Sequence, residues 1–434
     1  MAGARSFAVK LLGRMESSSA YSNLLLDDAL SGSRMSEQDK RFASALFYGT
    51  LERRYTIDAV IAVHLKNPKD KLSEDVRNIL RTGLYQLLYM DSVPDNAAVD
   101  ESVKLAKRLR NPALAGFVNG LLRSFIREGK QLPKGRNRIE ELSIGYSCPP
   151  WLTEKWIKEY GEETAVTMLS SSLGQAPTTV KANTLKMPLE EIESILKADG
   201  FKVTKADAAK EALSVSGGSI EKSRAYQAGL VHVQDISCML CCEALAPVEG
   251  ETVLDICSAP GGKAFTAAEL MNNKGRLLAF DLHENRVKLI RKGAERLGLS
   301  IIEAKVNDGK VFSSDIPAAD KVLCDVPCSG LGVIRRKPEI KYKSPEEFAR
   351  LPEIQYEILS VSSNYVKPGG RLVYSTCTLS RAENDCVAER FLKEHPEFSE
   401  GELPEKLGEG HTVTITPDRF GSDGFFIAVF TRKR

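Results

Sequence analysis

The chain has 434 residues, of which 42% are hydrophobic and 27% are charged, and its formal net charge is +2. This composition is typical of a globular protein, and the length allows two or three domains with separate cores. No apolar run reaches the roughly 18 residues that a membrane-spanning helix needs. The apolar stretch within residues 1–13 is short and interrupted, so no signal peptide is predicted. We therefore expect a cytoplasmic protein without a membrane partner.

Nine cysteines, an odd number, favour a reducing compartment over a disulfide framework. Cys238 and Cys241 form a CxxC pair, but they lie in an apolar segment that reads as a helix, and no second pair follows at zinc-like spacing. We expect no metal site. The basic residues gather in three places: Lys104, Lys107, Arg108 and Arg110; Lys134, Arg136 and Arg138; and Arg335, Arg336 and Lys337. A charge run is usually a solvated face, but three clusters favour a polyanionic partner.

Residues 1–130 are predicted to be all-helical. Apolar residues recur at helical spacing within four segments, which are 41–63, 76–90, 97–109 and 117–126. Pro68, Pro94 and Pro112 mark breaks, because proline disfavours a helical residue before it. The pattern indicates an all-α N-terminal bundle.

The rest of the chain changes pattern twice. Polar and basic residues predict a linker over 131–147, and residues 148–235 read as a small α+β module with strands at 178–185, 201–204 and 212–216 and a helix at 189–198. From 236 to 434, strands alternate with helices, which is typical of a parallel, doubly wound sheet. We expect strands at 252–256, 276–280, 301–306, 321–324 and 371–374, helices at 263–271 and 284–297, and a closing antiparallel hairpin of 412–415 with 425–430.

The first strand of this last region leads into a glycine-rich turn that opens a helix. Such a turn lets a ligand approach the backbone, and the helix N-terminus offers unpaired N–H groups to a carboxylate or phosphate. The turn is neither GxGxxG nor a phosphate loop, so nucleotide phosphates are not favoured. Asp281 ends the second strand, where it can accept from ribose hydroxyls, and Asp308 follows the third, within reach of an adenine amino group.

Taken alone, either aspartate is about equally often a helix N-cap and a ligand-binding group. Here, three successive strands are each followed by a glycine-rich turn or an aspartate. This arrangement fits adenosine with an amino-acid tail, which indicates S-adenosylmethionine (SAM). The cofactor-binding candidates are Cys257, Ser258, Ala259, Pro260, Gly261, Gly262, Lys263, Asp281, Asp308 and Asp325.

Two thiols, Cys328 and Cys377, each lie on a polar turn at the end of a strand. An isolated cysteine is most often a small buried hydrophobe. That interpretation suits Cys148, Cys241, Cys242, Cys324 and Cys386. It suits the two turn cysteines poorly, and together they suggest covalent chemistry.

Four stretches, 255–263, 325–330, 375–378 and 421–426, together resemble the RNA cytosine-5 methyltransferases of the NOL/NOP/Sun family. Residues 181–184 and 229–235 also resemble that family. The stretches 39–43, 48–51, 81–88 and 117–123 resemble the helical RNA-binding domain of the antitermination factor NusB. This combination is similar to the bacterial Sun/Fmu type, which methylates small-subunit (16S) ribosomal RNA.

The resemblance implies domains and roles. It implies that residues 1–130 form a NusB-like RNA-binding domain and residues 148–235 an RRM-like RNA-binding module. Residues 236–434 are implied to form a Rossmann-like, SAM-dependent catalytic domain. Cys377 is implied as the nucleophile that attacks carbon 6 of cytosine, Asp325 as the partner of N3, and Cys328 as the thiol for product release. Lys263 would favour the thiolate form of Cys377.

Several alternatives remain. DNA cytosine methyltransferases use a thiol in a Pro-Cys loop, so Cys328 is the rival nucleophile, although the Thr-Cys-Thr sequence favours Cys377. Transfer RNA could replace ribosomal RNA as substrate, and a non-enzymatic NusB-like RNA-binding or assembly factor is a third hypothesis. The front domain could also be a scaffold. We expect free or early-assembly 16S rRNA as the partner, no obligate protein partner, and a monomer. Arg335, Arg336 and Lys337 would hold phosphates beside the target base.

Overall fold

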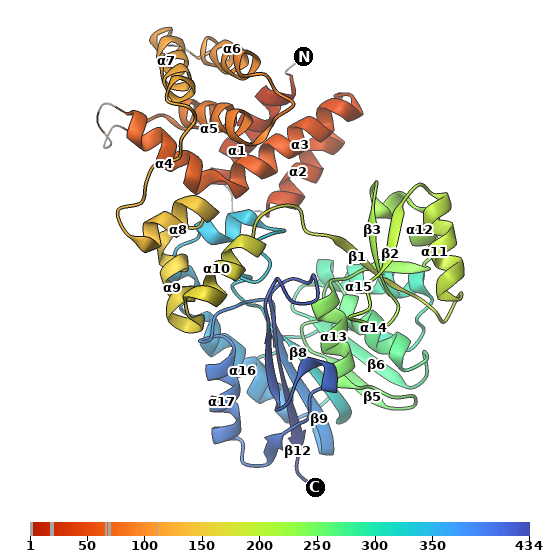
Figure 1. Ribbon diagram of the computed structural model, residues 1–434. Helices are drawn as coiled ribbons and strands as arrows, with labels where there is room; N and C mark the ends of the chain where they lie inside the picture. Colours follow the sequence, from red (N-terminus) through yellow and green to blue (C-terminus); the bar gives the residue numbers. More distant parts are fainter. Residues whose placement is uncertain (1–2, 18–20, 66, 68–70, 110) are drawn as a thin grey trace. The chain divides into compact units, whose positions relative to one another are not determined.

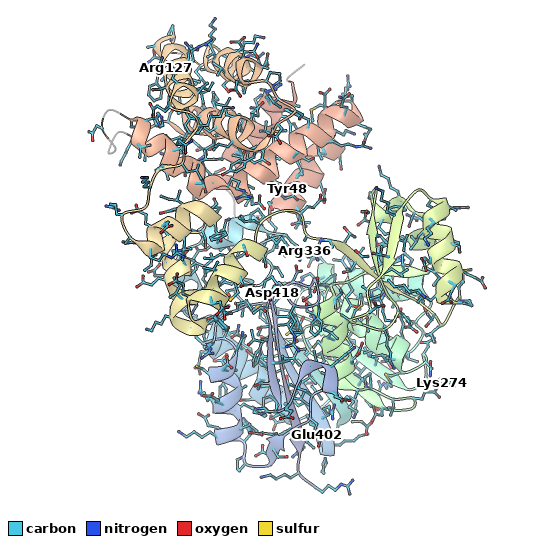
Figure 2. The ribbon with its side chains drawn as sticks, in the orientation of Figure 1. Tyr48, Arg127, Lys274, Arg336, Glu402 and Asp418 are labelled. Carbon is cyan, nitrogen blue, oxygen red and sulfur yellow. The ribbon has the colours of Figure 1, made fainter. Side chains whose placement is uncertain are left out.

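The structure is a computed structural model that describes residues 3–17, 21–65, 67, 71–109 and 111–434. It divides into two compact units (Figure 1). The first unit contains residues up to Gly174 together with Ile334–Lys343. The second contains Gln175–Val333 and Ser344–Arg434. Charged side chains such as those of Arg127 and Lys274 are exposed on the surface of their own units (Figure 2).

The first unit is helical, as its apolar spacing predicts. Its helices are α1 (Ala4–Ser17), α2 (Ser22–Ser31), α3 (Glu37–Glu52), α4 (Arg54–His64), α5 (Glu74–Tyr89), α6 (Asp95–Ala106), α7 (Ala113–Arg127), α8 (Arg138–Tyr146), α9 (Pro150–Tyr160) and α10 (Glu162–Ser171). Pro94 and Pro112 precede α6 and α7, which confirms those two breaks. The break at Pro68 and the charge of Arg110 lie outside the described residues.

Two expectations for this region need correction. The segment 41–63 is not one helix, because Arg53 leaves helical geometry and separates α3 from α4. The segment 131–147 is not simply a linker, because it contains α8. Asn137 begins α8 by accepting from the Glu140 N–H at 2.9 Å, and Leu142 is buried. The nine residues of α8 are too few to show the periodicity of a helix in the sequence.

The segment 334–343 follows one of the candidate thiols in sequence but packs within the helical unit. Its 3-10 helix η2 (Pro338–Tyr342) buries Lys341, whose ammonium donates to the Glu52 carbonyl at 2.7 Å. Glu339 accepts from the Ser22 N–H at 3.0 Å. This segment therefore completes the core of the helical unit.

The second unit begins with the small α+β module. Its sheet has the order β2-β3-β1-β4, with every neighbouring pair antiparallel. The elements are β1 (Thr178–Ala182), α11 (Leu189–Ala198), β2 (Lys202–Lys205), β3 (Ala212–Ser216), η1 (Ile220–Lys222), α12 (Arg224–Gln227) and β4 (Val231–Val233). The predicted helix at 189–198 and strand at 212–216 are confirmed.

An eight-stranded sheet forms the rest of the unit, with the order β10-β12-β9-β8-β5-β6-β7 and β11 paired to β12. Its strands are β5 (Thr252–Asp255), β6 (Arg276–Asp281), β7 (Ile302–Val306), β8 (Ala319–Asp325), β9 (Val366–Thr376), β10 (Phe398–Glu400), β11 (Thr412–Ile415) and β12 (Phe425–Arg432). Strands β5 to β9 run parallel to their neighbours, and β12 is antiparallel to β9. The doubly wound sheet and the closing hairpin are as predicted.

Helices cover both faces of this sheet (Figure 1). They are α13 (Ile236–Leu245), α14 (Gly262–Leu270), α15 (Glu284–Leu297), α16 (Leu351–Ser363) and α17 (Asp385–Glu394), with η3 (Pro345–Phe348) and η4 (Glu405–Leu407) in the connections. Alternate residues of β8 face opposite cores: Leu323 joins the cluster of α13–α15, and Val322 and Cys324 join that of α16 and α17. The carboxyl ends of the parallel strands meet at one edge, where such sheets hold their ligands.

The cysteines largely follow the burial expected of them. Cys148, Cys241, Cys242 and Cys324 are buried, but Cys386 is exposed, which corrects its interpretation as a core residue. It lies in the first turn of α17, whose buried side chains are Val387, Ala388 and Phe391. Within the described residues, no group of three metal-binding side chains occurs, and no helix is long and apolar enough to cross a membrane.

Candidate active site

The glycine-rich loop joins β5 to α14 at the carboxyl edge of the sheet. The Ser258 N–H donates to the Phe280 carbonyl at 2.7 Å, and the Gly261 N–H donates to the Ser258 carbonyl at 2.8 Å. Gly261 has a φ of +109°, and a Cβ there would lie 2.4 Å from the ring of Phe265. Only glycine fits this turn. The loop therefore brings the N–H groups of the first turn of α14 to the sheet edge.

The two candidate aspartates follow at the next strand ends, and neither is a helix N-cap. Asp281 accepts from the His283 N–H at 3.1 Å and pairs with Arg286 at 3.2 Å, whereas the N-cap of α15 is His283 itself. Asp308 accepts from the Lys310 N–H at 3.0 Å in a turn, and the next element along the chain is β8. The N-cap alternative is therefore excluded for both residues.

Apolar side chains that the sequence analysis did not single out lie beside these aspartates in the chain. Leu282, Val306 and Val311 are each about half exposed. Exposed apolar groups next to convergent polar ones are typical of a ligand site. They could have been predicted from their position within three residues of Asp281 or Asp308.

The two candidate thiols lie against each other. Strands β8 and β9 are parallel neighbours, with Asp325 opposite Ser375, so the loops that follow them meet. The Sγ atoms of Cys328 and Cys377 are 3.2 Å apart. This hydrogen bond, together with burial, raises the pKa of Cys328 well above its ordinary value. Cys328 therefore holds its proton at neutral pH and can donate it to the sulfur of Cys377.

Asp325 sits beside this pair and is held by two donors. The Ser375 hydroxyl donates to its Oδ1 at 2.8 Å, and the Lys263 ammonium donates to its Oδ2 at 2.8 Å. Lys263 also lies 3.3 Å from the Sγ of Cys238 and over the ring of Phe425. Burial lowers the pKa of Lys263, but Asp325, Cys238 and Cys241 together raise it by more, so that the net pKa is well above the ordinary value. Lys263 is therefore a fixed cation in the site.

Glu383, which the sequence analysis missed, binds both thiol loops. Its carboxylate accepts from the Ser329 N–H at 2.8 Å and the Ser329 hydroxyl at 2.6 Å, next to Cys328. It also accepts from Gln355 at 3.0 Å and from the Thr378 hydroxyl at 3.4 Å, next to Cys377. Only 2% of Glu383 is exposed. In the sequence, Glu383 is marked only by its position, six residues after Cys377.

The Gly-Ser-Asp-Gly-Phe motif packs against the same loops. The Gly424 N–H donates to the Gly332 carbonyl at 2.9 Å, and the Gly332 N–H donates to the Cys377 carbonyl at 3.0 Å. A Cβ on Gly332 would lie 2.0 Å from the Gly424 carbonyl oxygen. These two glycines let three backbone segments touch.

The predicted site residues thus come together at one sheet edge, with one exception. Arg335, Arg336 and Lys337 belong to the segment that packs within the helical unit, where the Lys337 ammonium lies 4.0 Å from the centre of the Tyr21 ring. Their contact with phosphates remains a prediction.

Comparisons with known proteins decide the family. Residues 242–431 match the 16S rRNA methyltransferase RsmB/F family, 2–127 the NusB family, and 148–219 the ferredoxin-like domain of RsmF/B-like methyltransferases. The probable ribosomal RNA small subunit methyltransferase B of Bacillus subtilis is 41% identical, over 99% of this chain and 98% of that protein. The corresponding Synechocystis protein is 34% identical, over 99% of both.

The chain belongs to the ribosomal RNA small subunit methyltransferase B family.

Solved structures agree with this assignment. The crystal structure of PH0851 superimposes with a TM-score of 0.82 at 28% identity, covering 99% of this chain and 98% of that one. A methyltransferase homolog from Pyrococcus horikoshii superimposes with a TM-score of 0.60 at 26% identity, covering 68% of this chain and 98% of that one. The NusB-like and Rossmann-like parts expected from the sequence are therefore confirmed, and the small α+β module, expected to be RRM-like, matches a ferredoxin-like domain.

Methyltransferases of this family depend on SAM, and the donors at the sheet edge fit it. The first turn of α14 offers N–H groups to a carboxylate, Asp281 offers a carboxylate to hydroxyls, and Asp308 follows on the next strand. When bound, SAM supplies an electrophilic methyl group.

Proposed function

We propose that this protein methylates carbon 5 of a cytosine in small-subunit ribosomal RNA through a transient bond between Cys377 and carbon 6 of the base. The observation that supports this most strongly is the pair of sulfur atoms 3.2 Å apart, next to the Asp325–Lys263 ion pair. Carbon 5 of cytosine is a poor nucleophile until a thiolate adds to carbon 6. Two thiols and an ion pair at one strand edge supply the groups for that addition.

Cys377 is proposed as the nucleophile and Cys328 as its proton partner. Because its pKa is raised, Cys328 keeps its proton, so its S–H can stabilise a thiolate on Cys377. When the sulfur of Cys377 bonds to carbon 6, the electron pair of the carbon 5–carbon 6 double bond becomes available at carbon 5. Carbon 5 would then take the methyl group of bound SAM, which would leave as S-adenosylhomocysteine.

Asp325 is proposed to bind the N3 edge of the base. Addition at carbon 6 moves negative charge towards N3, which takes up a proton from water and can then donate to a carboxylate. The Ser375 hydroxyl and the Lys263 ammonium hold the two oxygens of Asp325 and fix its orientation. Lys263 also places a positive charge at this edge, which favours thiolate and carboxylate over their neutral forms.

Product release reverses the addition. A base removes the carbon 5 proton, the electron pair of that C–H bond re-forms the ring double bond, and the carbon 6–sulfur bond breaks to return a thiolate. We assign this release step to Cys328, because its sulfur can return a proton to Cys377 over 3.2 Å. Without that thiol the adduct would persist.

The RNA is proposed to be free or early-assembly 16S rRNA. The match of residues 2–127 to the NusB family supports RNA binding by the helical unit, and the relatives are named as ribosomal RNA small subunit methyltransferases. A base must be flipped out or unpaired to reach a thiol at a sheet edge. Naked RNA meets that requirement more readily than a packed particle.

The test is direct methyl transfer. Purified protein, labelled SAM and unmodified 16S rRNA should yield 5-methylcytidine on nucleoside mass spectrometry, with bisulfite sequencing locating the base. Label in any other nucleoside would contradict the carbon 5 assignment. Label in transfer RNA but not in 16S rRNA would support the rival substrate. RNA binding without any transfer would support an assembly factor instead.

A further inference from the structure

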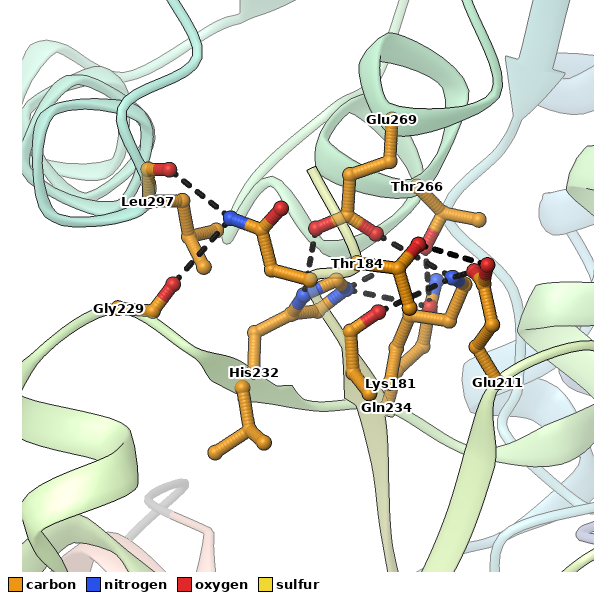
Figure 3. Close-up of polar contacts among 12 residues, drawn as sticks. Lys181, Thr184, Glu211, Gly229, His232, Gln234, Thr266, Glu269 and Leu297 are labelled. Carbon is orange, nitrogen blue, oxygen red and sulfur yellow. Dashed lines mark hydrogen bonds and ion pairs between the residues drawn. The ribbon is translucent and has the colours of Figure 1, made fainter. Parts of the chain in front are cut away.

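A buried polar cluster joins the ferredoxin-like module to helix α14 (Figure 3). Lys181 and His232 come from β1 and β4, Gln234 follows β4, and Thr266 and Glu269 come from α14. Each is at most 7% exposed. Burying five polar side chains is costly unless they bind one another. None of them belongs to the proposed chemistry, so their placement needs another explanation.

Gln234 fixes the module to the helix. Its backbone N–H donates to the Thr179 carbonyl at 3.1 Å, and its carbonyl accepts from the Thr179 hydroxyl at 2.6 Å. Its side-chain oxygen accepts from the Thr266 hydroxyl. Strand β1 thereby holds Gln234, and Gln234 holds α14.

His232 adds a second connection to the same turn. Its Nε2 lies 3.3 Å from both the Gln234 Oε1 and the Thr266 hydroxyl, and its Nδ1 lies 3.6 Å from Glu269. Its ring meets the edge of Phe265, and Phe265 covers Gly261 of the cofactor loop. Burial lowers the pKa of His232 to about 3, so the ring is neutral. The hydrogen-bonding contacts of the ring are made by Nε2, with Gln234 and Thr266.

Lys181 completes the cluster between two carboxylates, Glu211 of the module and Glu269 of α14. Burial raises the pKa of Glu269 to about 8, so this carboxyl is largely protonated at neutral pH and the cluster holds little net charge. A neighbouring contact extends the attachment to α15, where the Asn183 amide donates to the Leu297 carbonyl at 2.9 Å. The module therefore binds both helices that follow the first two strands of the parallel sheet.

We propose that His232, Gln234 and Thr266 are positioning residues that fix the first turn of α14 and so set the affinity for SAM. Thr266 lies one helical turn beyond Gly262, the residue at which α14 begins. This inference rests on the proposed position of SAM at loop 257–263. It gives the ferredoxin-like module a role in cofactor binding in addition to any contact with RNA.

Substitution of Thr266→Val tests the inference, because valine keeps the shape of the side chain and removes the hydroxyl. We expect S-adenosylhomocysteine to bind about three- to tenfold more weakly by calorimetry, the cost of a neutral hydrogen bond. The KM for SAM should rise by the same factor, with kcat and the KM for RNA within about twofold of wild type. Thr266→Ser should restore the affinity, and Thr204→Val, on the exposed face of β2, should not change it.

His232→Phe is the second variant, because it keeps a ring against Phe265 and removes both nitrogens; its expected effect is the same. Wild-type affinity in both Thr266→Val and His232→Phe would overturn the positioning role, provided that Asp281→Asn weakens binding. A fall in kcat with unchanged affinity would also overturn it. If Asp281→Asn itself binds normally, the proposed cofactor site is wrong, which is a separate failure.

Discussion

The Sγ atoms of Cys328 and Cys377 lie 3.2 Å apart, on loops that follow two neighbouring parallel strands. The hydrogen bond between them, together with burial, raises the pKa of Cys328. We propose Cys377 as the sulfur that attacks and Cys328 as the one that holds a proton. These separate roles lead to distinct outcomes for the two alanine variants.

Cys377→Ala should lower methyl transfer by at least about 10³-fold, because no thiolate remains to activate carbon 5. Cys328→Ala should instead accumulate a protein–RNA adduct that survives a denaturing gel. The measurement is gel retardation of labelled RNA with SAM present. An adduct formed by Cys377→Ala, and not by Cys328→Ala, would exchange the two roles.

Mild oxidation should join the same two sulfurs. They need to approach from 3.2 Å to a bond length of about 2.05 Å, so diamide should convert them to a disulfide and stop methyl transfer. Dithiothreitol should restore activity, and peptide mass spectrometry should find the 328–377 link. The exposed thiol offers a control: Cys386→Ala should respond as wild type does. Irreversible loss of activity, or a link through another cysteine, would refute the prediction.

Lys263→Met should lower kcat by about 10²-fold, because Asp325 loses the cation that holds its Oδ2. The control is Lys274→Met, since Lys274 is exposed and pairs with Glu249 at the surface. Steady-state methyl transfer at saturating SAM and RNA measures both variants. Equal rates in the two would show that the Lys263–Asp325 pair is structural only.

Glu383→Gln should loosen both thiol loops, because an amide offers one acceptor oxygen where the carboxylate offers two. Donors from Ser329 and Gln355 would lose a partner, at a cost of about 1–3 kcal/mol in the free energy of unfolding. We expect a lower melting temperature and a lower kcat with little change in the KM for SAM. Glu353→Gln, which alters an exposed ion pair with Arg390, serves as the comparison and should leave both quantities unchanged.

Lys341 should make the stability of the helical unit depend on pH. Burial lowers its pKa from 10.5 to about 8. Between these values the unfolded chain binds more protons than the folded one, so stability should rise with pH, by at most about 1.4 kcal/mol per pH unit. Lys341→Met should remove the rise between pH 8 and 9.5 and increase stability at pH 7.

Tryptophan fluorescence during urea unfolding measures this effect in the relevant unit, because both tryptophans, Trp151 and Trp156, lie on α9. The exposed lysine variant Lys104→Met should retain the pH dependence of wild type. A rise that persists in Lys341→Met would mean that another group is responsible.

Sequence periodicity was enough to predict the layout of the catalytic region. Helix α15 and strand β11 begin and end at the predicted residues, and the strand ends place Asp281, Asp325 and Cys377 at one edge. That success has a physical cause: the period of a strand or helix is local, and the carboxyl edge of a parallel sheet follows from the strand order.

What escaped prediction depends on contacts between distant residues. Glu383 looks like an ordinary acid in a loop until Ser329 is seen to donate to it from 54 positions away. Cys386 reads as a core cysteine until the buried stripe of α17 is known. The polar cluster around His232 was visible only as short stretches without an assigned role.

The helical unit needs residues 334–343 to fill its interior, and those residues lie far along the chain from the rest of it. During translation, helices α1–α10 would leave the ribosome well before residues 334–343 were synthesised. Fragments cut after Gly174 should consequently be poor stand-ins for the front half, and a graft of that half onto another enzyme would have to carry the short 3-10 segment with it.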